Sequence, residues 1–257
     1  MITKDNFFKI FPFQGEEDIK SYLYEKYIQA IRTDKPISVK FFLTPKYWSC
    51  LEEFCQGQNI PYVTEGFFPE GERRLFLFNY YPGDEIIGEV IVITNKSKFK
   101  LLKHKDYLGS ILALGIEREK LGDIVVKENK AYIAVMKDIS GYIISNLTTI
   151  GKNPCDIVPL RPNDELPKVH MEECKIIVTS RRLDVIVAAL ANLSRNDSIK
   201  AIEQGKVLLN YIDIKEKSQQ VRSPSTITIR GYGKYIIYDT VSNTKSGREV
   251  ISVKKFI

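Results

Sequence analysis

The spacing of apolar residues along the first 80 positions alternates between helical and extended patterns. Positions 18–31 predict a helix, because apolar side chains recur there at intervals of three and four. The run 37–43 is typical of a strand, and Pro45 after a threonine predicts the first turn of a helix that continues toward position 55. The apolar run 75–80 follows a turn-rich stretch. This part is therefore expected to form a small α/β unit.

The next segment has a clearer rhythm, with two helical patterns set among four extended ones. The predicted strands are 89–94, 124–126, 132–135 and 156–160, and the predicted helices are 106–114 and 139–150. A Glu128-Asn129 turn separates the two middle strands. The order strand-helix-strand-strand-helix-strand is typical of ferredoxin-like and RNA-recognition folds. The strands lack the aromatic run that stacks bases, so this fold does not itself indicate the function.

A polar, proline-punctuated stretch at 161–167 marks a domain boundary. After a strand at 172–179, apolar residues from Leu183 to Leu190 follow helical spacing. Ser194 predicts the cap of a second helix, and Gly205 predicts its end. Short strands follow at 207–210, 227–229 and 235–238.

These patterns predict an α+β protein of three domains. The expected divisions are an N-terminal α/β domain at 1–75, a central ferredoxin-like, RNA-recognition-like domain at 76–165, and a third domain with a C-terminal tail at 180–257. A chain of 257 residues is long enough for two or three separate cores.

Charge is distributed unevenly along the chain. Positions 181–257 hold 14 Lys and Arg against 7 Asp and Glu, a balance of +7. The totals of 38 basic and 32 acidic residues leave 24 and 25 for the first 180 positions, a balance of −1. A basic module on a neutral body suits a polyanionic partner, because each neutralised phosphate releases counterions. Charge alone is equally compatible with a solvated surface that has no partner.

Composition excludes several other classes of protein. Hydrophobic residues make up 44% and charged residues 27%, which is globular composition. No run approaches 18 apolar residues, and the N-terminus lacks the apolar core of a secretory signal, so we expect a cytoplasmic protein without membrane contact. The four cysteines are far apart and are expected to be reduced thiols, not a disulfide frame or zinc site.

The basic third domain contains many spaced positions of one RNA-binding module. The positions are Arg182-Leu183-Asp184, Ser194-Arg195, Ile202, Gly205, Val207, Asn210, Val221, Ile227 and Arg230-Gly231. Over about 60 residues this pattern resembles the S-four (S4) domain, a helix-turn-helix with hairpins found in a small-subunit ribosomal protein, several pseudouridine synthases and tyrosyl-tRNA synthetases. Two turns depart from it, since Tyr211 stands for a glycine and Pro224-Ser225 for Gly-Asp.

Segments outside this domain extend the resemblance to nearly the whole chain. The stretches 104–112, 114–118, 122–124 and 244–248 resemble the bacterial YlmH family. This resemblance implies a ribosome-associated RNA-binding protein that acts with peptidyl-tRNA on stalled large subunits during ribosome-associated quality control. The implied partners are rRNA, tRNA and the large ribosomal subunit, and the protein is expected to be a monomer.

Clustered cations of the third domain are the candidate RNA-binding residues. Arginine suits this task because its planar guanidinium can bind a phosphate with two hydrogen bonds and can also stack on a base. The candidates are Arg181, Arg182, Arg195, Asn196, Lys200, Lys206, Arg230 and Lys234. Lys103, Lys105 and Arg118 form a possible second RNA surface, although a solvated helix flank is at least as plausible there. Arg182 has an alternative role as a partner of Asp184, which would itself hold the N-terminus of its helix.

The alternative to a binding protein is an RNA-modifying enzyme, such as one resembling pseudouridine synthases, with an S4 domain for targeting. Asp123 in Gly122-Asp123 is the nearest match to a catalytic aspartate, but a turn is the simpler interpretation. The two histidines, His104 and His170, are not placed to form a Ser-His-Asp or metal site. We therefore predict a non-catalytic protein with no cofactor, no metal and no small-molecule substrate.

Overall fold

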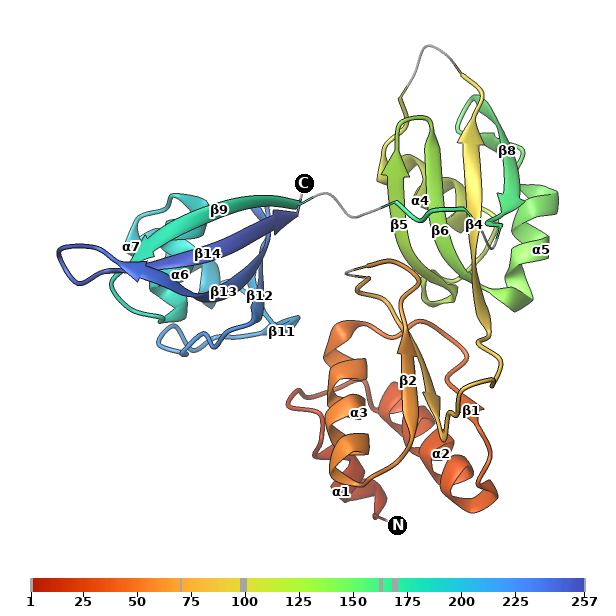
Figure 1. The fold of residues 1–257 in the computed structure, drawn as a ribbon, viewed down its shortest axis with the longest axis horizontal. Coiled ribbons are helices and arrows are strands. Elements are labelled where there is room, and N and C mark those ends of the chain that lie inside the picture. Colours follow the sequence, from red (N-terminus) through yellow and green to blue (C-terminus); the bar gives the residue numbers. More distant parts are fainter. Residues whose placement is uncertain (1, 70, 98–100, 162–163, 168–170, 257) are drawn as a thin grey trace. The chain divides into compact units, whose positions relative to one another are not determined.

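A computed structural model describes residues 2–69, 71–97, 101–161, 164–167 and 171–256. The chain divides into two compact units, which we call the N-terminal unit (Met1–Val169) and the C-terminal unit (His170–Ile257). Helices and antiparallel sheets occur in both (Figure 1). The structure thus confirms the α+β class predicted from the sequence.

The N-terminal unit begins with helices packed on a small antiparallel sheet. The helices are α1 (Lys4–Phe8), α2 (Glu17–Thr33) and α3 (Pro45–Gly57), and the strands β1 (Ile37–Ser38), β2 (Tyr62–Glu65) and β3 (Leu75–Phe78) lie in the order β1-β3-β2. Aromatic rings fill the core between them, where Phe7 packs on Tyr27 with ring centroids 5.5 Å apart. The strand expected at 37–43 is shorter than predicted, because after Ser38 the chain makes single hydrogen bonds to β3 and to Glu119 instead of a continuous ladder.

The second sheet of this unit has five strands, β4 (Gly88–Asn95), β5 (Leu121–Lys127), β6 (Lys130–Met136), β7 (Thr149–Ile150) and β8 (Asn153–Pro159). Their order is β5-β6-β4-β8-β7, and every pair is antiparallel. With α4 (His104–Leu112), a 3-10 turn (Arg118–Lys120) and α5 (Lys137–Asn146), the four longer strands follow the ferredoxin-like order. The helix predicted to reach Ile150 ends at Asn146, since 149–150 pair with β8.

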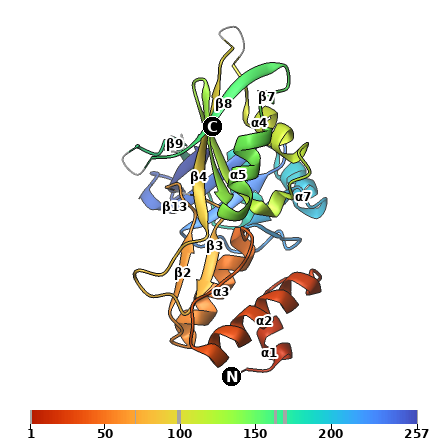
Figure 2. The same cartoon turned by 90° about the vertical axis from the view of Figure 1, so that its right-hand side faces the viewer.

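One hydrophobic cluster joins the two sheets of the N-terminal unit. Phe42 and Leu77 from the first part pack with Val90, Ala134 and Met136 of the second. The backbone N–H of Phe42 also donates to the carbonyl of Glu119 at 2.7 Å. The division of this unit at residue 75 remains a prediction, and β3, which spans that position, pairs with β1 and β2. Figure 2 shows β3 leading toward β4 along the chain.

The C-terminal unit is a six-stranded antiparallel sheet with two helices, α6 (Leu183–Ala191) and α7 (Arg195–Glu203). Its strands are β9 (Met171–Val178), β10 (Val207–Leu209), β11 (Ile212–Asp213), β12 (Ser225–Ile229), β13 (Gly233–Asn243) and β14 (Glu249–Phe256), in the order β11-β10-β12-β13-β14-β9. Alternate residues of the strands, such as Tyr235 and Ile237, pack with Leu183, Ile186 and Ile202 of the helices in one core.

The region after position 243 differs from the prediction. We expected a tail, but Glu249–Phe256 forms the long strand β14, which pairs with β13 and with the first strand of the unit, β9. Eight residue pairs join β14 to β9, from Glu249 with Val178 to Phe256 with Met171. The two ends of the C-terminal unit are therefore hydrogen-bonded neighbours.

Candidate nucleic-acid interface

Asp184, at the start of α6, holds two arginine side chains. Its own side chain is 0% exposed, and its Oδ1 and Oδ2 accept hydrogen bonds from Nε and Nη2 of Arg182 at 3.0 and 3.2 Å. Arg195, at the start of α7, donates from Nε to the same Oδ2 at 3.2 Å. The three residues, which we call the Asp184 clamp, fix the N-terminal ends of both helices to one another. The hydroxyl of Ser198 strengthens this joint by donating to the backbone carbonyl of Asp184 at 2.9 Å.

The electrostatics of the Asp184 clamp favour a permanently charged carboxylate. Burial raises the pKa of Asp184, but the hydrogen bonds and charges of Arg182 and Arg195 outweigh it and hold that pKa below its usual value. The arginines use only three of their ten N–H donors for Asp184. Their side chains stay 33% and 66% exposed. The clamp therefore orients two guanidinium groups at the surface, where they can bind phosphate.

Arg181 has a different environment from its neighbour Arg182. Its Nε donates to Oε2 of Glu249 at 3.1 Å, and its Nη2 donates to the hydroxyl of Thr240 at 2.9 Å. These partners lie on β14 and β13, and the arginine side chain is 21% exposed. Arg181 thus ties the chain just before α6 to strands β13 and β14. These contacts favour a structural role over the RNA contact predicted for it.

Two further candidates, Asn196 and Lys200, lie exposed on α7. The helix begins at Ser194, whose hydroxyl accepts from the backbone N–H of Asp197 at 3.1 Å, as the sequence predicts. Lys200 lies 3.8 Å from the carboxylate of Asp197, a distance at which an exposed pair contributes little to stability. Both side chains remain accessible to a ligand that approaches the start of α7.

Lys206 and Arg230 are brought together although 24 positions separate them. The backbone N–H of Arg230 donates to the carbonyl of Lys206 at 2.9 Å, and both side chains are exposed. Gly205, with a φ of +68°, ends α7 just before this point, as its position in the sequence predicts. The pair adds two cations at the junction between α7 and the β12–β13 hairpin.

Lys234 was expected in the loop of that hairpin, but it lies at the start of β13. Its Nζ is 4.3 Å from the ring centroid of Phe256 and 5.1 Å from that of Tyr211. Burial lowers the pKa of Lys234 to about 8. Because Tyr235 faces the helices, Lys234 faces the opposite side of the sheet and is not part of the surface around the Asp184 clamp.

The second predicted surface lies in the N-terminal unit and is less uniform. Lys103 and Lys105 are exposed beside the first turn of α4, where Asp106 accepts the N–H of Lys103 at 2.7 Å. Arg118 is half-buried and donates to the carbonyls of Leu121 and Gly122 at 2.7 and 3.2 Å. Burial and then the charge of Arg73 lower the pKa of Arg118 to about 10. The structure therefore separates two surface lysines from an arginine that braces the start of strand β5.

Asp123, the residue considered for catalysis, also has a bracing contact. Its Oδ2 accepts the backbone N–H groups of Glu72 and Arg73 at 2.5 and 3.0 Å. Burial raises the pKa of Asp123, although the N–H of Arg73 and the charges of Arg118, Arg73 and His104 act in the opposite direction. The prediction that Gly122-Asp123 forms a turn was wrong, because both residues lie within strand β5, and nothing in the sequence indicated this long-range contact. Asp123 interrupts the pairing of β5 with β6, where the register shifts between Leu121 and Ile124.

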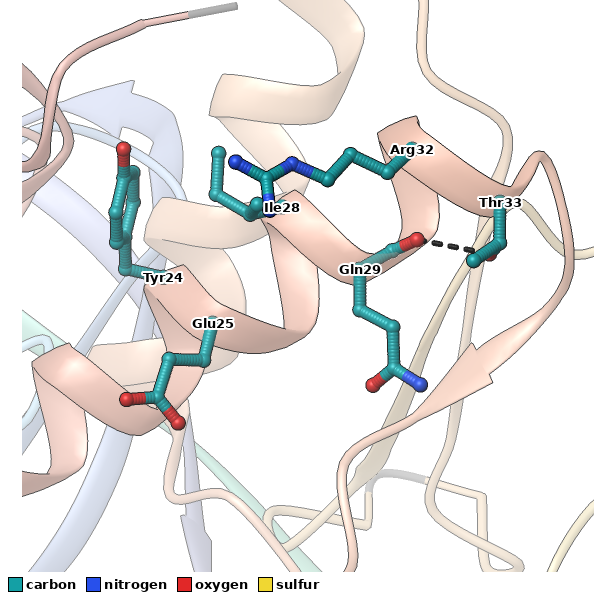
Figure 3. Close-up of a pocket in the computed structure, with 6 residues that line it drawn as sticks. All are labelled: Tyr24, Glu25, Ile28, Gln29, Arg32 and Thr33. Atoms are coloured by element: carbon teal, nitrogen blue, oxygen red, sulfur yellow. Dashed lines mark hydrogen bonds between the residues drawn. The ribbon is translucent and has the colours of Figure 1, made fainter.

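The largest remaining question of binding concerns a surface hollow on helix α2. A hollow of about 350 Å³ lies on α2, and Figure 3 shows its lining side chains spread along that single helix. Polar groups do not converge on it from several elements, as they do in most ligand sites.

All four cysteines are free thiols. Across the described residues, no group of three His, Cys, Asp or Glu is placed to hold a metal, and no helix is long and apolar enough to cross a membrane. His104 begins α4, and His170 lies outside the described residues.

Comparisons with known proteins agree with the sequence patterns. Residues 86–163 match the family described as "Putative RNA-binding domain in YlmH", and residues 181–226 match the S4 domain. The chain is 26% identical over 212 residues to the "Ribosome-associated protein quality control protein P2" of Bacillus subtilis (strain 168), covering 80% of this chain and 82% of that protein. These findings confirm the resemblance to the YlmH family and show that the chain carries RNA-binding domains.

A solved structure also resembles part of the chain. The cell division protein ylmH from Streptococcus pneumoniae is 22% identical, with a TM-score of 0.46, over 58% of this chain and 94% of that one.

Proposed function

We propose that this protein, which combines a YlmH-type RNA-binding domain with an S4 domain, is a non-catalytic RNA-binding factor of the ribosome. It would bind rRNA and tRNA on the large subunit during quality control of stalled nascent chains, as a cytoplasmic monomer without a cofactor or small-molecule substrate. The name of the Bacillus subtilis relative supports the ribosomal part of this proposal.

The observation that carries the proposal is the Asp184 clamp. It lies within the S4 match and presents Arg182 and Arg195 from the starts of two helices. Double-stranded RNA is recognised mainly through its backbone, so a rigid pair of guanidinium groups suits a folded rRNA or tRNA. Lys200, Lys206 and Arg230 would extend the contact along the same helices and hairpin.

Such a surface acts by binding one RNA conformation better than others. The bound state then becomes more populated by the difference in binding free energy, without any covalent step. The alternative of an RNA-modifying enzyme would assign catalysis to Asp123. The hydrogen bonds from the backbone of Glu72 and Arg73 to its carboxylate support a structural role instead.

The test is sucrose-gradient co-sedimentation of the full-length protein with ribosomal subunits over a range of salt concentrations. The Arg182→Ala, Arg195→Ala double variant should bind more weakly, and its salt dependence should flatten by about two units of slope, since two phosphate contacts are lost. The matched control is Arg32→Ala, Lys35→Ala, which removes the same charge from an exposed part of the N-terminal unit.

Each outcome has a definite meaning. Large-subunit binding that is lost only in the Arg182/Arg195 variant supports both the ribosomal role and the site. Equal binding by all three proteins would rule out the Asp184 clamp as the interface. A modified nucleotide missing from the rRNA or tRNA of cells that lack the gene, detected by mass spectrometry, would favour the enzyme instead.

A further inference from the structure

The open side of the C-terminal sheet carries an ordered cluster of rings and lysines. Both α6 and α7 pack on one side of this sheet (Figure 1). On the other side, Thr228 pairs with Lys234 and Phe256 pairs with Met171, which places these residues in one row across the strands. Among the described residues of this unit, no helix covers that side. We call it the open sheet face.

Tyr211 contributes a ring to this face from a conformation that disfavours a side chain. Asn210 and Tyr211 form the two-residue turn between β10 and β11, with φ angles of +48° and +67°. Such turns favour glycine, because a side chain in this left-handed region is strained. The turn itself does not require tyrosine. What the tyrosine adds is a ring 5.1 Å from Nζ of Lys234.

A second cation and ring lie one row further along. Lys254 is 5.6 Å from the ring centroid of Tyr238, and its acidic neighbour Glu173 lies 3.7 Å away. Lys175 also faces this side, since it pairs with Ser252, two positions before Lys254. The open sheet face therefore holds three lysines beside three aromatic rings, together with two carboxylates, Glu173 and Asp213. Asp213 lies in the row of Lys234, because it pairs with Leu208 and Leu208 pairs with Thr228. Alternating rings and cations are what proteins use to bind single-stranded nucleic acid, with bases on the rings and phosphates on the cations.

We propose that the open sheet face binds unpaired nucleotides of RNA, with bases stacking on Tyr211 and Tyr238 and phosphates near Lys234 and Lys254. This site is separate from the Asp184 clamp, because its residues point to the other side of the sheet from the helices. The unit would then hold a paired RNA segment at its helices and an unpaired one at its sheet. The proposal requires RNA binding alone, so it can fail or succeed independently of a role on the ribosome.

The test compares two RNA probes with the full-length protein by fluorescence anisotropy. One probe is a single strand of mixed sequence, about 12 nucleotides long and unable to pair with itself, and the other is a duplex of equal length. Tyr211→Gly removes the ring while giving the turn its preferred residue, so the melting temperature should be maintained or raised. We expect this variant to bind the single strand at least fivefold more weakly and the duplex unchanged.

Three matched variants define the result. Tyr211→Phe should bind like the wild type, because it keeps the ring. Tyr81→Ala removes an exposed tyrosine from the N-terminal unit and should have no effect. Arg182→Ala, Arg195→Ala should weaken the duplex more than the single strand.

The proposal is overturned if Tyr211→Gly binds the single strand as tightly as the wild type. It is also overturned if both probes weaken equally, which would indicate one shared surface. Unchanged RNA binding combined with weaker co-sedimentation with ribosomal subunits would assign the open sheet face to a protein partner and would equally reject the proposal.

Discussion

Two aspartates of this protein lie beside arginines, one in each unit, and the two sites differ in which atoms form the bonds. At Asp184 the carboxylate binds arginine side chains, so the guanidinium groups are oriented at the surface. At Asp123 the carboxylate binds backbone N–H groups, while Arg118 donates to backbone carbonyls. The first arrangement presents cations to a ligand, whereas the second uses both charges to hold loops in place.

The pKa directions separate the sites in the same way. The arginines keep the pKa of Asp184 below its usual value despite burial. At Asp123 burial dominates and raises the pKa, even with Arg73 and Arg118 nearby. Residue types alone therefore do not distinguish a binding cluster from a structural joint, and the partners of each polar atom do.

The largest effect is expected from Asp184→Ala. It removes three charge-assisted hydrogen bonds and the negative charge at the start of α6, so the free energy of unfolding of the C-terminal unit should fall by about 3 kcal/mol. Affinity for duplex RNA should fall as well, because Arg182 and Arg195 lose their orientation. Urea denaturation and RNA titration measure the two effects.

Asp197→Ala is the control for that change, because Asp197 is an exposed carboxylate on α7.

Asp184 has a folded-state pKa below the usual 3.8, so its contribution to stability is present above pH 3.8 and is lost as the pH falls through the folded value. Full RNA affinity in Asp184→Ala would contradict the orienting role of the clamp.

Asp123→Ala should lower the free energy of unfolding of the N-terminal unit by about 2 kcal/mol, because two backbone hydrogen bonds are lost. RNA affinity should not change, which sets this site apart from Asp184.

The pH dependence of the stability contributed by Asp123 has the opposite sign to that of Asp184. The raised folded-state pKa means that the contribution of Asp123 declines as the pH rises from 3.8 through the folded value. Asp123→Asn should abolish that decline in denaturation curves recorded across this range.

Lys234 extends the comparison to a cation that is partly removed from water. Its folded-state pKa of about 8 lies below the usual 10.5, so the folded protein releases this proton first and stability should increase between pH 8 and pH 10.5. Solvent screening of this partly exposed lysine reduces the roughly 3 kcal/mol that the full pKa difference would give, so we expect the wild type to gain about 1 kcal/mol relative to Lys234→Met over this range. A wild-type curve without that difference would show that water reaches the lysine freely.

The smallest effect is expected from Lys200→Ala. Its exposed ion pair with Asp197 should contribute less than about 0.5 kcal/mol to stability, so denaturation should hardly change. Loss of one phosphate contact should flatten the salt dependence of RNA binding by about one unit of slope.

Lys105→Ala is the corresponding test of the surface beside α4, and an equal slope change there would make that surface part of the interface.

Local patterns were enough to predict most of the fold. The ferredoxin-like order followed from helical and extended spacing between positions 89 and 160, and the two helices of the S4 domain followed from Ser194, Gly205 and the apolar stripe. Strand β14 was missed because its pairing with β9 joins residues more than 70 positions apart. The short strand β7 was read as the end of α5 because its apolar residues continue the helical spacing.

The candidate site was predictable as a set of cations but not as a geometry. Spacing could place Arg181 and Arg182 together, but only the folded chain shows that one bonds to Glu249 and the other to Asp184. Lys234 was assigned to a loop because the glycines before it resemble a turn. The strand pairing places it in the sheet, facing Phe256 and Tyr211.

The position of β14 between β13 and β9 has a consequence for folding during synthesis. Among the described strands β9 pairs with β14 alone, and the paired residues are more than 70 positions apart. Strand β9 is therefore made early but cannot join the sheet until β14 has left the ribosomal exit tunnel, whereas the N-terminal unit can fold while synthesis continues.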